Sequence, residues 1–321
     1  MNTADTNRWK VALETRLGPG TIQERVPLAP LTTFRIGGPA DLFFQAKTAD
    51  QLVAVLTRSR ELEIPTFLLG RGANILVGDA GFRGLVVRSD VGGVDFLGSG
   101  RVRAGAGVEV FPHLIQATVG EGLGGLHHFV GIPSSVGGAL WQNLHFLSPA
   151  PARERTVFIE EFVESAEIFS EEGNRDEVGR DYFRFGYDYS ILHDRSDVVL
   201  SVTFHLRSHP PSEMERVMEE NLRWRRERHP DLQSHPSAGS IFKKVEKEGA
   251  GRLIDQCGLK GRIHGGAQIF ERHANIIVNL GGATSADVLA LMGLAQETVF
   301  EKTGQTLVPE ITLVGEFSPQ V

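Results

Sequence analysis

The stretch HHFVGIPSSVGGALWQN, residues 127–143, has glycines at 131, 137 and 138 and serines at 134 and 135. So many small residues in one segment indicate that something approaches the backbone closely, because glycine carries no side chain. Two earlier segments are similar, LTTFRIGGPA at 31–40 and LLGRGANILVGDAGFRG at 68–84, and each mixes glycine with serine, threonine or asparagine. We expect their exposed backbone N–H groups to surround one phosphate-bearing cofactor.

The usual phosphate-binding fingerprints do not explain these segments. After Gly70 and Gly72 the third glycine of a dinucleotide fingerprint is replaced by Ile75, and the following residues have an extended rather than a helical pattern. No run ends in Gly-Lys-Ser or Gly-Lys-Thr, which excludes a P-loop. Three independent tight turns remain the simpler alternative for any single run.

Composition narrows the class of protein. The chain has 321 residues, of which 41% are hydrophobic and 23% charged, as in soluble globular proteins. A net charge of -7 argues against nucleic-acid binding, which rests on clustered lysine and arginine. No apolar run has the length of a signal peptide core or a membrane span. The single Cys257 suits a reducing compartment, so we expect a cytoplasmic protein without membrane or nucleic-acid partners.

Helix-like and strand-like stretches alternate without an internal repeat, which predicts an α+β fold with a boundary near residue 208. A capping box of Thr48 and Gln51 predicts a helix that ends before Pro65. A second capping box of Ser212 and Glu215 predicts a helix with one apolar face. The pattern predicts further helices over 111–123 and 285–303, a short apolar strand before Gly37, and strands over 66–70, 84–91, 101–110, 163–173, 197–208, 274–280 and 307–317.

Successive segments of this chain resemble the signatures of bacterial UDP-N-acetylenolpyruvoylglucosamine reductases. The resemblance runs from about residue 31 to residue 315 and is to the type that lacks the extra substrate loop. It implies an FAD-binding fold of the vanillyl-alcohol oxidase (PCMH) type, with an N-terminal extension (1–24), an FAD module (25–207, subdomains 25–90 and 91–207) and a substrate domain (208–321). The segments are TTFRIGGPADL, GRGANILVGDAGFRG, GIPSSVGGALWQN, HPSAGSIFKK, AGRLIDQCGLKG, GGAQIFERHANIIVN and LVPEITLVG.

The family resemblance implies the chemistry of the site. NADPH would reduce a non-covalently bound FAD, which would then reduce the enolpyruvyl ether of a UDP-sugar substrate to UDP-N-acetylmuramate for peptidoglycan synthesis. Ser240 matches the family's proton donor, and Glu310 matches the glutamate beside the developing enolate. The resemblance leaves the oligomeric state open, and we expect a monomer.

The remaining family positions divide between cofactor and substrate. Arg225 and Arg228 share a helical face and match a basic pair near the substrate diphosphate, although a solvated basic face would have the same spacing. Tyr187, Lys243 and Lys244 are the other expected substrate residues. The expected cofactor residues are Thr33, Arg35, Gly37, Gly38, Gly70, Gly72, Ala73, Asn74, Gly131, Ile132, Ser135, Gly137, Gly138 and Asn143.

This chain departs from the family pattern around the substrate. Asp188 stands where the family has an arginine thought to polarise the substrate carboxylate, and Lys244 and Val245 replace Asn-Pro. The usual Met-Asn-Ala-Gly is QNLH from Gln142, and Ala73 stands where serine is commoner. Three readings of Asp188 stay open. Lys244 could return the lost positive charge, which we favour; Asp188 could share a proton with Glu310; or Asp188 could be a surface turn residue outside the site.

These departures also keep other functions open. A flavin oxidase or dehydrogenase of the same fold could act on another substrate, and His127 or His128 could then tether the flavin covalently, although neighbouring histidines are more simply packing or turn residues. A non-catalytic protein that binds flavin or a nucleotide sugar is the third possibility.

Overall fold

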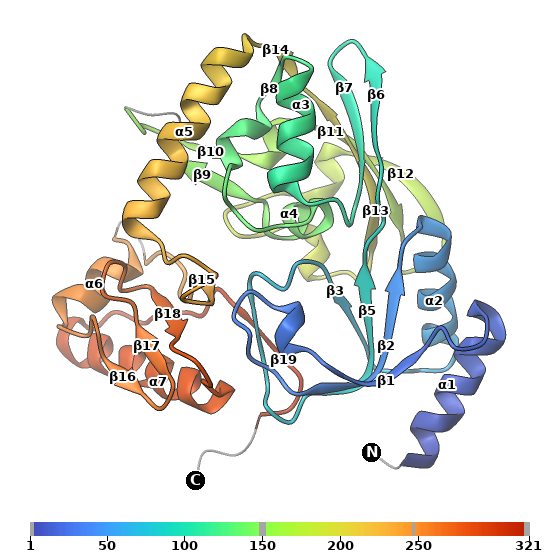
Figure 1. Cartoon of the computed structure of the whole chain (residues 1–321), viewed down its shortest axis with the longest axis horizontal. Helices are drawn as coiled ribbons and strands as arrows, with labels where there is room; N and C mark the ends of the chain where they lie inside the picture. The colour runs from blue at the N-terminus through green and yellow to red at the C-terminus, as the bar shows by residue number, and fades with distance from the viewer. Residues whose placement is uncertain (1–2, 148–151, 246–247, 318–321) are drawn as a thin grey trace.

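The computed structural model describes residues 3–147, 152–245 and 248–317, which form three bodies (Figure 1). The N-terminal body has a four-stranded sheet in the order β1-β2-β5-β3, in which β2, β5 and β3 run parallel and β1 is antiparallel. Helices α1 and α2 pack on each other and on this sheet. The elements are α1 (Thr3–Leu17), β1 (Gln23–Pro27), β2 (Pro39–Ala46), α2 (Ala49–Glu61), β3 (Thr66–Leu69) and β5 (Phe82–Ser89).

The central body is built on a five-stranded antiparallel sheet in the order β12-β11-β13-β7-β6. Helix α4 packs on β13 and β7, and two short strand pairs, β9 with β10 and β8 with β14, flank the sheet. The elements are β6 (Val94–Gly98), β7 (Arg101–Gly105), α3 (Ile115–Gly120), β8 (Leu123–Gly124), α4 (Val136–Gln142), β9 (His145–Leu147), β10 (Thr156–Phe158), β11 (Val163–Phe169), β12 (Arg175–Gly179), β13 (Val198–His205) and β14 (Arg207–Ser208).

The C-terminal body has an antiparallel sheet in the order β15-β18-β17-β16, packed against α7. Helix α5, which follows the expected boundary, lies along the central body (Figure 1) and buries Met214 and Val217. The elements are α5 (Pro211–Arg228), β15 (Ser237–Ser240), α6 (Ala250–Gln256), β16 (Ile263–His264), β17 (Ala267–Ile269), β18 (Ile276–Asn279) and α7 (Ser285–Thr303).

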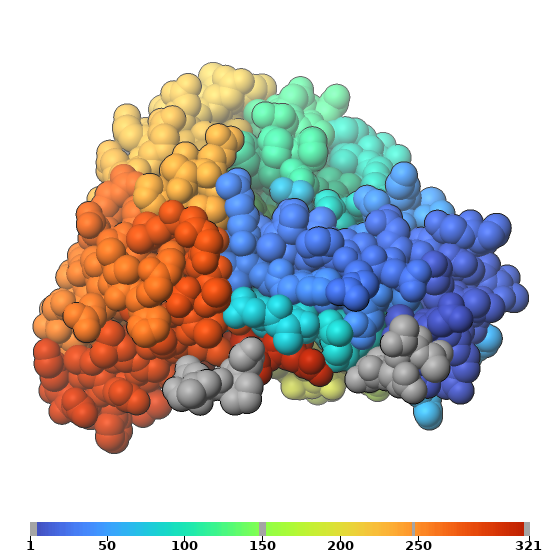
Figure 2. Space-filling view, turned by 60° about the horizontal axis from the view of Figure 1, so that its bottom comes forward, coloured from blue at the N-terminus to red at the C-terminus, as the bar shows by residue number. Residues whose placement is uncertain are grey.

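The end of the chain returns to the N-terminal body. Strand β19 (Thr312–Val314) pairs in parallel with β4 (Ile75–Val77), so residues just before β19 are placed beside the second glycine segment. Figure 2 shows the C-terminal body, orange to red, abutting the blue N-terminal residues. The α+β fold is therefore confirmed, and within the described ranges no helix has the length and apolar character that a membrane span requires.

The helix signals in the sequence were partly correct. Thr48 caps α2 by accepting a hydrogen bond from the Gln51 N–H at 3.2 Å, as expected. The capping box at Ser212 is wrong, because α5 starts earlier, at Pro211, with Pro210 as an N-cap that makes no side-chain bond. Proline suits the first helical position, here Pro211, since its fixed φ is helical and the N–H it lacks would have no partner.

Two further expectations need correction for local reasons. The helix expected over 111–123 is regular only from Ile115 to Gly120, because Phe111, which precedes a proline, is extended. Residues 32–36, directly before Gly37, form no strand; they follow a 3-10 turn (Ala29–Leu31), and the glycines lead into β2 instead.

Gly37 and Gly38 are required by the protein's own packing. A Cβ on Gly37, whose φ is +139°, would lie 2.6 Å from the Val77 Cβ, and one on Gly38 would lie 2.2 Å from the Asp79 carbonyl oxygen. The part of the chain that approaches Gly37 and Gly38 closely is therefore residues 77–81.

Candidate active site

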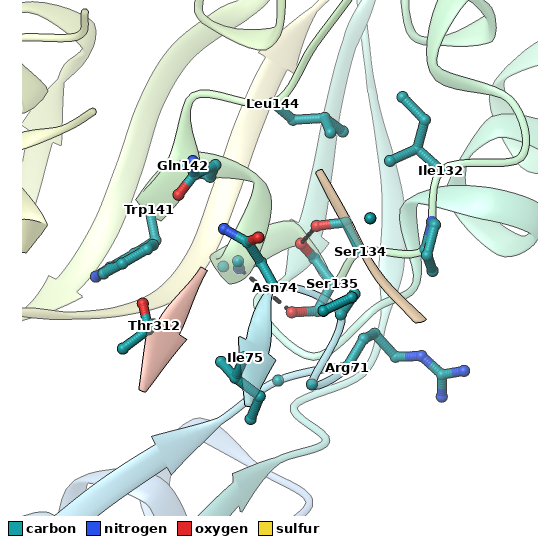
Figure 3. A pocket seen from close by; sticks show the side chains of 18 of the residues that line it. Arg71, Asn74, Ile75, Ile132, Ser134, Ser135, Trp141, Gln142, Leu144 and Thr312 are labelled. Carbon is teal, nitrogen blue, oxygen red and sulfur yellow. Dashed lines mark hydrogen bonds between the residues drawn. The ribbon is translucent and has the colours of Figure 1, made fainter. Parts of the chain in front are cut away.

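A cavity of about 1190 Å³ lies where the three bodies meet. Cavities for small ligands commonly measure about 300–1,000 Å³, so this one has room for a cofactor together with a substrate. Most of the expected cofactor residues line it, namely Gly70, Gly72, Ala73, Asn74, Gly131, Ile132, Ser135, Gly137 and Gly138. Figure 3 labels Asn74, Ile132 and Ser135 among them.

Gly70 and Gly72, in segment 68–84, let neighbouring segments approach closely. A Cβ on Gly70 would lie 2.5 Å from Ser135 Oγ, and one on Gly72 would lie 2.6 Å from the Leu31 carbonyl oxygen. Ser135 is also the N-cap of α4 and accepts a hydrogen bond from the Gly138 N–H at 3.3 Å (Figure 3). The chain around Gly70 therefore lies close against the opening segment, residues 127–143, and the two segments together form one wall of the cavity.

Other expected cofactor residues lie apart from this wall. Thr33 and Arg35 line a smaller cavity of about 270 Å³ that shares Gly70 with the large one. Gly37 and Gly38 are packed against the chain, as described above. Asn143 is fully buried and ends α4, and its side chain donates to the Gly186 carbonyl at 2.9 Å. Its observed contacts hold the loop that precedes Asp188.

The structure brings Ser240, Glu310 and Asp188 to the same cavity, from β15, from the residues before β19 and from the loop after Gly186. Asp188 is 1% exposed, which excludes a surface turn residue. Neither of its carboxylate oxygens has a hydrogen-bond partner among the described residues. Its φ of +51° puts it in a backbone conformation that non-glycine residues seldom adopt.

Two carboxyl groups in one apolar pocket resist ionising together. Burial, aided by the charge of Asp188 and opposed by Lys243, raises the pKa of Glu310 from 4.5 to about 8. Glu310 is therefore a neutral acid at pH 7 and can donate a hydrogen bond, as a carboxylic acid in an apolar site does.

The two expected lysines separate. Neither is among the residues that line the cavity, but Lys243 is half-buried and acts electrostatically on Glu310, whereas Lys244 is exposed. Tyr187 is 51% exposed at the edge of this region, with its ring 4.7 Å from the ring of His145. Partial burial and the two carboxyl groups raise the pKa of Tyr187 to about 12.

The expected arginine pair also separates. Arg225 lines the cavity with its guanidinium 5.7 Å from the Phe146 ring, and burial lowers its pKa to about 10. Arg228 is exposed, stacks at 4.8 Å over the Trp224 ring and donates to Glu227. Spacing placed both residues on one helical face but could not distinguish the direction of each side chain.

Sequence reasoning missed several lining residues. Arg226 and Arg272 add positive charge, and Arg272 donates to the Arg226 carbonyl at 2.9 Å. These contacts join α5 to the segment before β18, so no local pattern could reveal them. The other missed lining residues include Arg71, Trp141, Gln142, His145, Phe146 and Thr312.

His127 and His128 do not line the cavity. Their rings are 4.1 Å apart, and burial lowers the pKa of His127 to about 3 and that of His128 to about 4. Both are packing residues in the central body, which argues against either as a covalent flavin tether.

Comparison with known proteins covers nearly the whole chain. Residues 40–175 match the model of an FAD binding domain, and residues 230–314 match that of the UDP-N-acetylenolpyruvoylglucosamine reductase C-terminal domain. Reductases of that name from a Synechococcus species and from Pelobacter propionicus are each 38% identical, over 94% and 90% of this chain and 95% and 94% of their own. The crystal structure of the Thermus caldophilus reductase is 34% identical with a TM-score of 0.74, covering 91% of this chain and 99% of that one.

Proposed function

The chain belongs to the UDP-N-acetylenolpyruvoylglucosamine reductase family, and from this we propose that it uses FAD and NADPH to reduce UDP-N-acetylglucosamine enolpyruvate to UDP-N-acetylmuramate. The observation that carries the proposal is one cavity lined both by the glycine segments and by Ser240 and Glu310. The proposal includes a cytoplasmic monomer with non-covalently held FAD.

The cavity fits FAD on two grounds. Its volume of about 1190 Å³ exceeds that of common single-ligand sites. Backbone at Gly70, Gly72, Gly137 and Gly138 lines the wall, where its N–H groups can bind a diphosphate. FAD, when bound there, would carry hydride from NADPH to the substrate. The residues of segments 68–84 and 127–143 that we propose to bind FAD are those that line this wall.

The protein's own residues would act on the substrate. Hydride addition to the enolpyruvyl double bond leaves an enolate, which needs a proton on carbon and stabilisation at oxygen. We assign the proton to the Ser240 hydroxyl and the stabilisation to Glu310, whose pKa of about 8 keeps it a hydrogen-bond donor at neutral pH. Arg225, with Arg226 and Arg272, would hold the diphosphate, because guanidinium groups bind phosphate oxygens in pairs.

A second function is favoured by one observation. The unpartnered carboxylate of Asp188 faces the same cavity as Glu310, which would suit a substrate without a carboxylate. A flavin oxidase or dehydrogenase acting on such a substrate is therefore the alternative.

The two half-reactions separate these functions. In anaerobic stopped-flow experiments, NADPH should bleach the flavin, and the enolpyruvyl nucleotide should then restore its colour. Acid precipitation should release all flavin into the supernatant. Oxygen consumption without NADPH, or flavin retained on the pellet, would favour the oxidase. A flavin that does not cycle with NADPH and the enolpyruvyl nucleotide would indicate a binding protein.

A further inference from the structure

Asp188 raises an electrostatic question that the proposed function leaves unanswered. It is 1% exposed, and neither carboxylate oxygen has a hydrogen-bond partner in the described part of the chain. A buried carboxylate without a partner is costly, so a cation or a proton must accompany it.

One basic group lies within ion-pair distance of Asp188 among the described residues. The His145 Nδ1 atom is 3.7 Å from Asp188 Oδ1. His145 lines the cavity and keeps 21% of its side chain exposed, so it faces both the buried carboxylate and the space for a substrate.

The other titratable groups around Asp188 are less suited to be its partner. Glu310 and Tyr187 are acids whose pKa values the Asp188 charge raises. Lys243 acts on Glu310 and on His193. His193 stacks on Trp141 at 3.6 Å and has its Nε2 2.9 Å from the Trp141 carbonyl oxygen, and burial lowers its pKa.

We propose that Asp188 orients His145 as its ion-pair partner, and that the imidazolium of this pair binds the carboxylate of the enolpyruvyl substrate. The inference rests on the proposed function and names a residue that the family resemblance did not assign. His145 is the catalytic residue, because it would touch the substrate, and Asp188 is its positioning residue.

The geometry fixes the imidazole for this role. Nδ1 lies 3.3 Å from the Asn143 carbonyl oxygen, which can accept its proton, and 3.7 Å from Asp188 Oδ1, which is within ion-pair distance. Nε2 has no protein partner among the described residues, and in the protonated ring it is a second donor. The rings of Tyr187 at 4.7 Å and Phe158 at 5.2 Å pack on the imidazole and limit its rotation.

The backbone around the pair is held as well. Asn143 ends α4 and donates to the Gly186 carbonyl at 2.9 Å, which links the segment before His145 to the loop that carries Asp188. His145 is also paired with Phe158 in the β9–β10 ladder.

Protonated His145 would act by its charge alone. No bond to His145 forms or breaks, and its proton remains on the ring while Ser240 supplies the proton that carbon receives. The positive charge offsets the negative charge of the substrate carboxylate, which grows as the enolate forms.

The test uses single-turnover reoxidation of the NADPH-reduced holoenzyme by the enolpyruvyl nucleotide. His145→Gln should slow reoxidation about 10- to 100-fold, with reduction by NADPH unchanged within about twofold. His113→Gln is the matched control: His113 lies 3.6 Å from Glu109 in a pair of the same kind, but is 68% exposed and outside the cavity.

Asp188 is tested through its coupling to His145. Asp188→Asn should slow reoxidation, Asp188→Glu should restore part of the rate, and the double variant should lose little beyond the worse single variant. In ¹⁵N-histidine NMR of the resting holoenzyme, Asp188→Asn should move the His145 ring signals, identified by their absence in His145→Gln.

The outcomes separate the inference from the function. If the parent protein cycles but His145→Gln reoxidises at the parent rate, or if the losses in the two single variants add fully, the pair is overturned. A parent protein that is never reoxidised by the enolpyruvyl nucleotide overturns the proposed function instead.

Discussion

The side of the cavity that we propose for the cofactor and the side that we propose for the substrate match the family pattern to different degrees. The cofactor side, residues 70–75 and 131–138, matches the expected segments except at Ala73, and these residues line one wall. The substrate side, residues 142–146 and 186–190 with Lys244, carries the departures. Its charged groups include a buried unpartnered Asp188 and the neighbouring His145.

The difference follows from what each side is made of. The cofactor wall includes backbone at its glycines, and a Cβ on Gly70 would meet Ser135 Oγ at 2.5 Å, so a side chain there disturbs the wall itself. The substrate side presents side chains from separate elements, and a charge lost at one position can be returned from another. We therefore expect changes on the cofactor side to weaken flavin binding, and changes on the substrate side to slow only the second half-reaction.

The largest effect should come from Ser240. Ser240→Ala removes the proposed proton donor, and a general acid typically contributes about 100- to 10,000-fold. Reoxidation by the enolpyruvyl nucleotide should slow by that factor, while FAD content and reduction by NADPH stay at parent values. Stopped-flow absorbance of the flavin measures both steps. Unchanged single-turnover reoxidation would show that Ser240 is not the donor.

The next effect concerns the pH dependence of stability on the substrate side. The Glu310 carboxyl group has a pKa of 4.5 in the unfolded chain and of about 8 in the folded protein, so it holds its proton more tightly in the folded protein. Its stabilising contribution is fully present below about pH 4.5 and is lost as the pH rises to about 8. At roughly 1.4 kcal/mol per pH unit, the loss is on the order of 3–5 kcal/mol.

Glu310→Gln keeps a neutral side chain and should remove this dependence. Urea unfolding of the two proteins at several pH values should show the variant to be the more stable one at pH 9. Glu219→Gln, at an exposed position of α5, is the control and should match the parent. Parallel pH profiles for parent and Glu310→Gln would contradict the raised pKa.

The sequence revealed the backbone features of this molecule better than its side-chain contacts. The cap at Thr48 and the three glycine segments are local signals, and the family motifs led to Ser240 and Glu310, which the structure brings together. The contact joins His145, in the short strand β9, to Asp188, in a loop 43 residues further along the chain, so no local pattern could predict it. Exposure likewise separated Arg225 from Arg228, which spacing alone made equivalent.

A smaller effect is expected from the cofactor wall. Gly70→Ala places a methyl group against Ser135 Oγ, which can shift only by disturbing the cap of α4. Overpacking of this kind typically costs about 1–3 kcal/mol, so the Kd for FAD should rise about tenfold or more. Fluorescence titration of the apoprotein with FAD measures it. Gly120→Ala, where a Cβ meets nothing within 4 Å, is the control, and equal affinities in the two variants would contradict our account of the wall.

The smallest effect should follow Lys244→Asn, which restores the family's residue at a position that the sequence alone marked as a charge rescue. Lys244 is exposed and outside the cavity, whereas Lys243 is half-buried and acts on Glu310. An exposed charge is screened by water and salt, so its removal contributes little at a site that it does not touch. Reoxidation in Lys244→Asn should stay within about twofold of the parent rate, and Lys243→Gln should slow it more. If Lys244→Asn is the slower variant, and adding Asp188→Arg recovers its rate, Lys244 supplies the positive charge that is missing at position 188. The substrate side is then arranged differently from our description.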